Sequence, residues 1–344
     1  MKKNILVTGG LGYIGSHTVV ELITNGYEVT IIDDLSNSRI EVLDNIEKIT
    51  GTKPTFFQFN LEDKTKLKQV FESTDFDAVI HFAAHIFVDE SVENPLKYYK
   101  NNIISLLNLL SVMTFDYGQN DKPANLIFSS SCTVYGEPDV LPISEKSPIK
   151  DSPSPYGTTK IMAEKILNDV CRLEKGINGI SLRYFNPVGA HDSALIGEFP
   201  KGKPRHLFPI ISKVLKGESK ELKIYGNDYN TKDGTCVRDY IHVVDLAKAH
   251  VKAIKRFDNN NIDSYESYNI GTGNGSSILE VIQSFEKITG EKINYSFAER
   301  RKGDVAEIWA NSTLANGILD WKAERDLDNM VETAEKWEKT FKTN

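Results

Sequence analysis

Two groups of residues in this sequence have types and spacings that could support redox chemistry on an alcohol, and the first is Tyr156 with Lys160. Four positions apart on a helix, their side chains share one face and place an ammonium beside a phenol. The positive charge would favour the phenolate and lower the tyrosine pKa from its usual value near ~10, so that Tyr156 could act as a general base. Ser131 could donate a hydrogen bond to the same substrate oxygen. We therefore predict Tyr156, Lys160 and Ser131 as catalytic residues, against the alternative of a tyrosine and a lysine packed by their stems on a helix surface.

The second group is a glycine-rich segment near the N-terminus, Thr8 to Gly15, which reads TGGLGYIG. Gly9, Gly12 and Gly15 would allow a tight turn after a strand, a close approach of backbone N–H groups to phosphate, and close packing of the following helix. The N-terminus of that helix would hold the diphosphate of a dinucleotide. A purely structural turn is the alternative, but a strand, a turn, a helix and an acidic strand end follow one another in the order that dinucleotide sites use.

Asp33, with Asp34 after it, ends the second apolar run of the chain. A carboxylate at this position accepts hydrogen bonds from the ribose hydroxyls of adenosine and repels a 2′-phosphate. The sequence therefore predicts NAD rather than NADP as the cofactor, with a solvated turn as the alternative for the two aspartates.

The segments that must position these residues alternate between apolar strands and amphipathic helices. We expect strands at 5–7, 28–32, 55–59, 78–82, 126–128 and 178–183, and helices at 14–25, 64–72 and 95–117. Such alternation is typical of a Rossmann-like, doubly wound parallel sheet in an α/β protein. Ser131 and the glycine segment both follow strands, so they should meet at the carboxyl edge of this sheet. That convergence favours the catalytic interpretation of Tyr156 and Lys160 over the surface one.

The local composition of the sequence changes after residue 187, where loops rich in glycine and proline separate short helices and strands. We therefore expect an NAD-binding domain over 1–187 and a smaller C-terminal, substrate-binding lobe over 188–344. An amphipathic helix at 243–256 indicates that 240–258 packs back on the first domain.

Composition restricts the class of protein. The chain has 344 residues, 40% of them hydrophobic, and a net charge of −7. It is long enough for a large core and lacks the basic stripe of a nucleic-acid-binding protein. No apolar run is long enough to span a membrane, and the run after Lys3 is too short for a signal peptide. The three cysteines lack a CxxC spacing and the seven histidines lack metal-binding spacings, so we expect no disulfide framework, no metal and a cytoplasmic location.

Five segments carry a resemblance that runs over nearly the whole chain. They read VTGGLGYIGSH at 7–17, SSSCTVYG at 129–136, RYFNPVGA at 183–190, DGTCVRDYIHV at 233–243 and RRKGD at 300–304. On these segments the chain resembles the extended short-chain dehydrogenase/reductase superfamily and, within it, the UDP-glucose 4-epimerase family. The resemblance implies NAD-dependent interconversion of UDP-glucose and UDP-galactose at C4, through a transient 4-keto sugar, in galactose metabolism.

The resemblance also implies a mechanism. Tyr156 would take the proton from the 4-hydroxyl while C4 passes a hydride to NAD, and because binding is concentrated on UDP, the keto sugar could turn over before the hydride returns. Two alternatives stay open: a UDP-N-acetylglucosamine 4-epimerase or another nucleotide-sugar epimerase or dehydratase, and a non-catalytic NAD-binding regulator. A dehydratase usually has an Asp-Glu pair where this chain has Cys132-Thr133, and a regulator need not keep the three catalytic residues together.

The family pattern implies residues for both ligands. For NAD they are Gly9, Gly12, Tyr13, Ile14, Gly15, Asp33, Asn37, Ser38, Asn60, Leu61, Phe82, Ala83, Asn101, Ser129, Tyr156, Lys160 and Tyr184. For the UDP-sugar they are Ser131, Tyr156, Asn186, His206, Leu207, Ile224, Tyr225, Arg238, Arg301, Asp304 and Ile308. Arg238 and Arg301 would hold the diphosphate as bidentate forks, and Asp304 would accept a ribose hydroxyl of uridine.

The chain departs from the family pattern within these implied sites. Ile86 replaces a lysine that contacts the cofactor phosphates in many epimerases, Asn60 replaces an aspartate near the adenine, and His206 replaces an asparagine in the substrate loop. Ile308 stands at the gate of the sugar pocket, which is tyrosine in hexose-specific members and small in those that accept N-acetylhexosamines. An isoleucine would form a fixed apolar wall, so we expect UDP-glucose and UDP-galactose as the preferred pair, with weak activity on UDP-N-acetylglucosamine.

Two predicted helices carry apolar residues on more than one face, which is unusual for a helix with one side in water. These residues are Leu96, Ile103, Leu106, Leu107, Leu109 and Leu110 in segment 95–117, and Ile161, Met162, Ile166 and Val170 after Tyr156. Together with the resemblance they predict a homodimer, with cover inside the monomer as the alternative.

Overall fold

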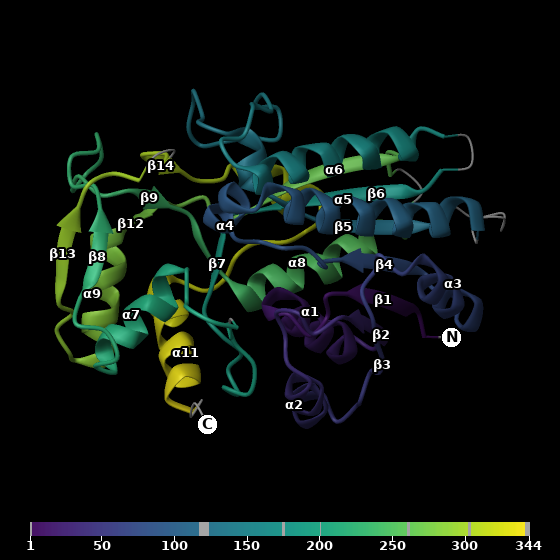
Figure 1. Cartoon of the computed structure of the whole chain (residues 1–344), viewed down its shortest axis with the longest axis horizontal. Coiled ribbons are helices and arrows are strands. Elements are labelled where there is room, and N and C mark those ends of the chain that lie inside the picture. Colours follow the sequence, from purple (N-terminus) through teal and green to yellow (C-terminus); the bar gives the residue numbers. More distant parts are fainter. Residues whose placement is uncertain are drawn as a thin grey trace.

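The computed structural model describes residues 2–116, 124–173, 176–199, 201–259, 262–301 and 304–340. Within these ranges, seven parallel strands form one sheet in the order β11-β6-β5-β4-β1-β2-β3 (Figure 1). Their bounds are β1 Asn4–Thr8, β2 Glu28–Asp33, β3 Thr55–Gln58, β4 Ala78–His81, β5 Asn125–Ser131, β6 Asn178–Tyr184 and β11 Tyr265–Ile270. The strand order reverses between β1 and β4, as in a doubly wound sheet. The predicted Rossmann-like α/β fold is therefore confirmed.

Helices cover both faces of this sheet (Figure 1). One face carries α1 Tyr13–Thr24, α2 Glu41–Thr50 and α8 Val243–Arg256, and the other carries α3 Lys64–Ser73, α4 Val88–Glu93, α5 Pro95–Ser111 and α6 Pro155–Cys171. Successive side chains of a strand point to opposite faces, so Ile5 and Val7 pack with the first group and Leu6 with the second. All three are fully buried. A strand covered on both faces reads as a continuous apolar run, which is why 5–7 shows no alternation.

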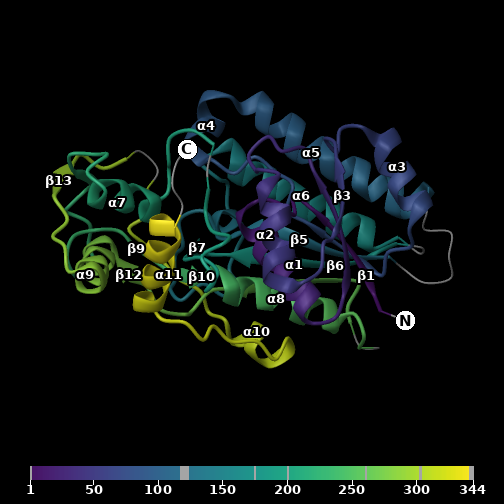
Figure 2. The same ribbon diagram turned by 90° about the horizontal axis from the view of Figure 1, so that it is seen from below.

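The C-terminal lobe lies at one end of the sheet (Figure 2). Its core packs α7, α9 and α11 around the short parallel pair β8 and β13. The elements of this part are α7 Leu207–Leu215, β8 Leu222–Tyr225, β9 Val237–Arg238, β12 Ser276–Ser277, α9 Ile278–Thr289, β13 Tyr295–Ala298, β14 Glu307–Ile308 and α11 Leu327–Thr340. Between the sheet and the lobe, β7 Asn186–Val188 pairs with β10 Tyr240–His242, and α10 Thr313–Ile318 contacts β11.

The chain passes between the sheet and the lobe more than once. α8, which lies within 240–258, packs against α1. Segment 265–270 forms β11 at the edge of the sheet, although the sequence interpretation placed it in the lobe. Its sequence, YESYNI, is too polar to indicate a strand of the main sheet. A division at residue 187 therefore leaves this edge strand on the wrong side.

The segment predicted as one helix over 95–117 is α-helical only in its first part. α5 stops at Ser111, and a π-helical turn, η1, covers Val112–Asp116, while Tyr117 lies outside the described residues. In the part of the chain that the structure describes, no helix is both long and apolar enough to cross a membrane.

Candidate active site

A cavity of about 700 Å³ lies between the carboxyl edge of the sheet and the C-terminal lobe. Every residue predicted for the NAD site lines it. Every residue predicted for the UDP-sugar site also lines it, with the exception of Ile308. Residues at the ends of several strands, on helices α1, α5 and α6, and in the second lobe thus line one space.

The glycine segment forms a turn with no room for side chains. Gly9 has φ +72°, and a Cβ there would lie 2.8 Å from the amide nitrogen of Ala83. A Cβ at Gly15 would lie 2.2 Å from the carbonyl oxygen of Gly9. α1 begins directly after Gly12, and no side chain caps its first N–H groups. These groups line the cavity and present the positive end of the helix dipole to it, which suits the diphosphate of a dinucleotide.

Asp33 is buried at the end of β2 and is held by three hydrogen bonds. Its carboxylate accepts from the backbone N–H of Leu11 (3.1 Å) and of Leu35 (2.9 Å) and from Ser38 Oγ (2.6 Å). Burial raises the pKa of this carboxyl, and the hydrogen bonds work against that rise. A carboxylate has about four acceptor positions, so one remains for a ribose hydroxyl. The residues present therefore fit NAD.

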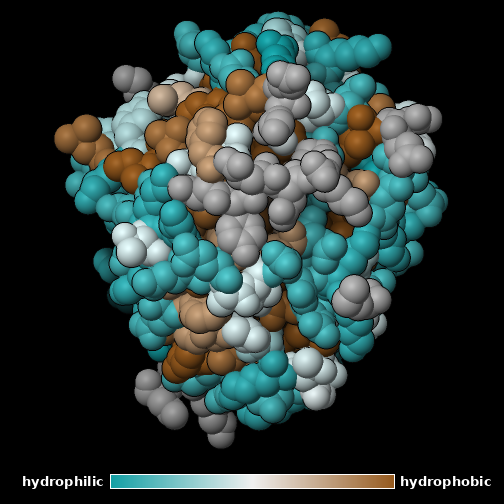
Figure 3. Space-filling model, turned by 90° about the vertical axis from the view of Figure 1, so that its right-hand side faces the viewer, coloured by the Kyte–Doolittle hydropathy of each residue, from teal (hydrophilic) through white to brown (hydrophobic). Residues whose placement is uncertain are grey.

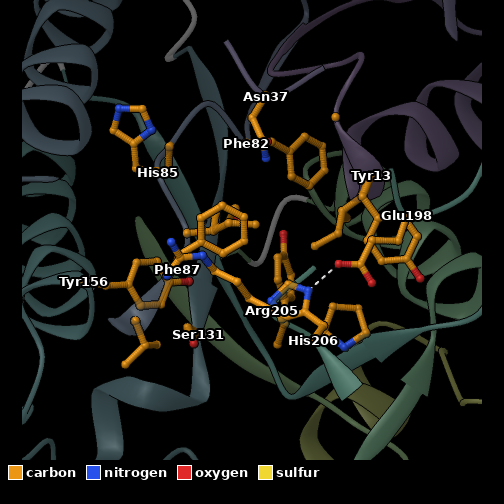
Figure 4. A pocket seen from close by; sticks show the side chains of 18 of the residues that line it. Tyr13, Asn37, Phe82, His85, Phe87, Ser131, Tyr156, Glu198, Arg205 and His206 are labelled. Carbon is orange, nitrogen blue, oxygen red and sulfur yellow. Dashed lines mark hydrogen bonds and ion pairs between the residues drawn. The ribbon is translucent and has the colours of Figure 1, made fainter. Parts of the chain in front are cut away.

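Tyr156 and Ser131 lie together on one side of the cavity, and Tyr13 and Glu198 lie on the other (Figure 4). α6 begins at Pro155, where the Oγ of the N-cap Ser154 accepts the N–H of Gly157, so that Tyr156 falls in the first turn. Ser131 is the last residue of β5, and its side chain lies beside that of Tyr156. The structure thus places the predicted base next to the predicted hydrogen-bond donor.

Lys160 lies one helical turn after Tyr156 and is 3% exposed. Its Nζ donates to the carbonyl oxygen of Ser129 at 2.6 Å and lies 5.7 Å from the centre of the Tyr156 ring. Burial lowers the pKa of Lys160 to about 7, with the Glu164 carboxylate acting in the opposite direction.

The prediction that the Lys160 ammonium lowers the pKa of Tyr156 below its usual value is wrong. Burial raises the pKa of Tyr156 to about 12, although the neighbouring Ser131 side chain opposes the rise. The spacing of Tyr156 and Lys160 revealed that they share a helix face, but it could not show that Lys160 is buried and Tyr156 partly buried. Desolvation penalises the phenolate and the ammonium alike.

The second lobe supplies the charged groups at the other end of the cavity. Arg238 Nη2 lies 3.8 Å from a carboxylate oxygen of Asp304. The guanidinium of Arg301 lies 3.8 Å from the centre of the Tyr225 ring, a cation–π contact that leaves its edge free to meet an anion. Lys302 and Gly303 of the RRKGD segment lie outside the described residues. Two arginines and an acceptor for a hydroxyl suit a nucleoside diphosphate.

His206 directly precedes α7, and its Nδ1 pairs with the carboxylate of Glu198 at the cavity (Figure 4). Burial lowers the pKa of His206, but the carboxylate of Glu198 more than offsets this, so the pKa is raised above its usual value. Glu198 and its neighbour Arg205 were not predicted. Arg205 lies over the Phe87 ring at 5.2 Å and pairs with Asp89. Both residues come from a loop of irregular structure, and no local spacing marks them.

Ile308 is placed differently from the prediction. It is 6% exposed and packs in an apolar cluster with Cys132 and Phe185, which do line the cavity. Ile308 therefore lies behind the wall of the cavity, and the prediction that it forms the wall itself is wrong. Ile308 lies in β14, which pairs with β9, and its side chain is buried in this cluster. Ile86, by contrast, lines the cavity and is 39% exposed.

A parallel dinucleotide-binding sheet whose edge carries a serine beside a tyrosine, with a lysine one helical turn after the tyrosine, defines the extended short-chain dehydrogenase/reductase class. In the described ranges, no group of three histidine, cysteine, aspartate or glutamate side chains could hold a metal ion. A family model described as GDP-mannose 4,6 dehydratase matches residues 6–334.

Relatives narrow the class further. A UDP-glucose 4-epimerase from Yersinia enterocolitica is 47% identical over 336 residues, which are 98% of this chain and 97% of that protein. The structure of UDP-glucose-4-epimerase from Stenotrophomonas maltophila, with bound NAD and formylated UDP-arabinopyranose, matches with a TM-score of 0.94 at 44% identity, covering 98% of each chain. That of UDP-glucose 4-epimerase from Bifidobacterium longum, in complex with NAD+ and UDP, matches with a TM-score of 0.92 at 45% identity, also over 98% of each chain. This chain belongs to the UDP-glucose 4-epimerase family of NAD-dependent epimerases and dehydratases.

Proposed function

We propose that the protein is an NAD-dependent epimerase that interconverts UDP-glucose and UDP-galactose at C4 of the sugar. The observation that carries this proposal is the shared cavity. Its sheet edge fits a dinucleotide, the second lobe presents Arg238 and Arg301 for a second diphosphate, and Tyr156 and Ser131 line the same cavity. The similar proteins named above are UDP-glucose 4-epimerases, and one of them was solved with NAD+ and UDP.

NAD would be held by the first turn of α1 and by Asp33 with Ser38, while Lys160 would donate to the ribose of the nicotinamide half. When bound, NAD supplies the hydride acceptor and a positively charged ring that favours a nearby phenolate. A cofactor that is regenerated in each cycle can stay bound between turnovers.

The protein's own groups would move the proton and hold the sugar nucleotide. Tyr156 would take the proton of the 4-hydroxyl, with Ser131 donating to the same oxygen, and would return a proton after the keto sugar has turned over. Arg238 and Arg301 concentrate binding on the diphosphate. The sugar then has few fixed partners, so it can present either face of C4 for reaction.

Two rival functions have less support. A dehydratase would need an acid beside Ser131, but Cys132 is buried and its pKa is raised to about 12 by that burial. A non-catalytic regulator would not require Tyr156 and Ser131 to lie side by side at the cavity. Activity on UDP-N-acetylglucosamine stays a weaker second activity in this proposal, because Ile308 supports the wall at Cys132 and Phe185 without entering the cavity.

The test is an assay of the purified protein on UDP-galactose, with and without added NAD, in which UDP-glucose is the measured product. We expect conversion, and we expect Tyr156→Phe to abolish it while NAD stays bound. Conversion that is absent even with saturating NAD would refute the proposal. UDP-N-acetylgalactosamine in the same assay gives the ratio of the two activities.

We also propose that two copies pair through the outer faces of α5 and α6, which lie side by side. The residues on this face that are exposed are Leu96 (80%), Leu107 (45%), Met162 (40%) and Ile104 (37%). Hydrophobic side chains gather in the upper half of Figure 3, the side on which these helices lie in Figure 1. The other residues predicted for the interface are covered within the monomer: Ile103, Leu106, Leu109 and Leu110 are buried, and Ile161, Ile166 and Val170 are partly buried.

Light scattering at micromolar concentration tests this pairing, and a monomer mass would refute it. Leu107→Glu should shift the mass toward the monomer, because a charge would be buried in an apolar contact.

The cytoplasmic location also stays a proposal, supported by three cysteines that are all free thiols.

A further inference from the structure

A buried ion pair lies directly behind the catalytic residues. The carboxylate of Glu164 on α6 accepts two hydrogen bonds from Arg183 on β6, from Nε at 2.9 Å and from Nη2 at 2.7 Å. It accepts a third from Ser130 Oγ on β5 at 2.5 Å. Glu164 is 7% exposed, Arg183 5% and Ser130 1%. The contact therefore joins a helix and two neighbouring strands in the interior (Figure 1).

The network continues beyond Arg183. Its Nη1 donates to the hydroxyl of Tyr135 at 2.8 Å, and that hydroxyl donates to Asn269 Oδ1 at 2.6 Å. Asn269 in turn donates to the carbonyl oxygen of Ile143 at 2.9 Å. Tyr135 belongs to the 3₁₀ helix η2, Cys132–Tyr135, which follows Ser131 without a break. The segment after the catalytic serine is thus fixed to β6 and β11.

The positions of these residues relate them to the reaction. Glu164 lies one helical turn after Lys160, and Ser130 lies between Ser129 and Ser131 in the chain. Two hydrogen bonds therefore join α6 to the end of β5 one turn apart: Lys160 to the Ser129 carbonyl oxygen, and Ser130 to Glu164. A slide of α6 along the strand would break both bonds, and it would also move Tyr156 away from Ser131.

The buried ion pair of Glu164 and Arg183 is not explained by a need for folding stability. Well-packed apolar residues are often as stabilising as a buried ion pair, because the desolvation of two charges opposes their attraction. A bidentate fork, however, fixes both distance and direction. We infer that Glu164, oriented by Arg183, is a positioning residue that holds Ser131 and Lys160 in register with Tyr156 through Ser130 and the helix turn. This inference rests on the proposed epimerase function.

A second consequence of the arrangement concerns charge. Burial lowers the pKa of Lys160, and the carboxylate of Glu164 acts against this. The same residue that fixes the helix thus also favours the charged form of the catalytic lysine.

The test is Ser130→Ala, which removes one hydrogen bond to Glu164 and leaves the ion pair in place. The chain offers a matched control in the C-terminal lobe, where Ser212 Oγ donates to Glu335 Oε1 at 2.7 Å. Ser212 is 1% exposed and Glu335 6%. Both variants lose a buried serine–glutamate bond of the same kind, so a similar fall in Tm is expected in both.

The activities should separate the two variants. For Ser130→Ala we expect kcat to fall about 10-fold with KM within about 2-fold, since small displacements of reacting groups cost more in the transition state than in binding. For Ser212→Ala we expect kcat within about 2-fold of the unaltered protein. Glu164→Gln, which keeps the shape and loses the charge, should lower kcat further and shift its pH profile, whereas a purely structural role would leave that profile unchanged.

The outcomes are distinct. If Ser130→Ala and Ser212→Ala lose equal stability and both keep kcat, the positioning role is overturned while the epimerase function stands. If the unaltered protein does not epimerise UDP-galactose, the proposed function fails and this inference fails with it. If Ser130→Ala does not fold, Tyr135→Phe at the far end of the network gives the same comparison of kcat with KM.

Discussion

Replacing Lys160 by methionine should make the protein more stable at low pH and much less active. The pKa of Lys160 falls from 10.5 to about 7 because the ammonium is buried. Its folded pKa therefore lies below the unfolded one, and the unfolded chain binds more protons between these two values. The stability linked to this group is present above pH 10.5 and is lost as the pH falls through about 7. At about 1.4 kcal/mol per pKa unit, burying this amine costs ~5 kcal/mol at pH 6, where it is charged in the folded protein, and ~2 kcal/mol at pH 9, where it must lose its proton on folding.

Methionine has a similar length and carries no charge, so it removes this cost. It also removes the hydrogen bond to the Ser129 carbonyl oxygen, a loss of about 1–3 kcal/mol that does not depend on pH. The difference in free energy of unfolding, Lys160→Met minus unaltered protein, should therefore be positive at pH 6 and fall by about 3 kcal/mol between pH 6 and pH 9. The other buried titratable groups are common to both proteins and cancel in this difference.

Denaturant unfolding at several pH values, with the NAD content of the two proteins matched, measures the difference directly. Lys165→Met is the control, because Lys165 is exposed on the same helix, and its difference should be flat. A flat difference for Lys160→Met as well would refute the reasoning, since it would mean that the folded protein keeps Lys160 as well solvated as the unfolded chain does.

Three further predictions concern the cavity. Tyr156→Phe should fold and retain NAD but lose at least about 10³-fold in kcat; activity within tenfold of the unaltered protein would remove Tyr156 as the base. Ile308→Ser should raise kcat/KM for UDP-N-acetylglucosamine by no more than about 3-fold, below the ~1–3 kcal/mol of a direct clash, because Ile308 acts only through the residues in front of it; a rise of about 100-fold would show that it enters the cavity. Glu198→Gln removes the carboxylate that raises the pKa of His206, so the imidazole should lose its proton at lower pH. KM for UDP-galactose should then begin to rise at a lower pH than in the unaltered protein, and an unchanged pH profile of KM would exclude His206 as a charged ligand.

The sequence predicts most accurately where chemistry depends on local spacing. The glycine turn, Asp33 at the strand end and the Tyr156–Lys160 pair are all set by residues a few positions apart, and the structure brings them to one cavity. Contacts that depend on distant pairing were missed. β11 joins the sheet through backbone pairing with β6, which its polar side chains do not reveal. Ile308 is buried against Cys132 and Phe185, which are far from it in the sequence.

Burial of the catalytic groups was also beyond the sequence, and it changes the chemical argument. Tyr156 and Lys160 are each less easily charged in the folded protein than in water, so neither can be regarded as a free phenol or a free amine. The low-polarity surroundings that penalise their charges also strengthen any charge interaction formed in the cavity. A cation brought beside Tyr156 would therefore lower its pKa by more than the same cation would in water. On this view the base becomes effective when the ligands fill the cavity, while Glu164 and Arg183 keep the helix and the strand in register until then.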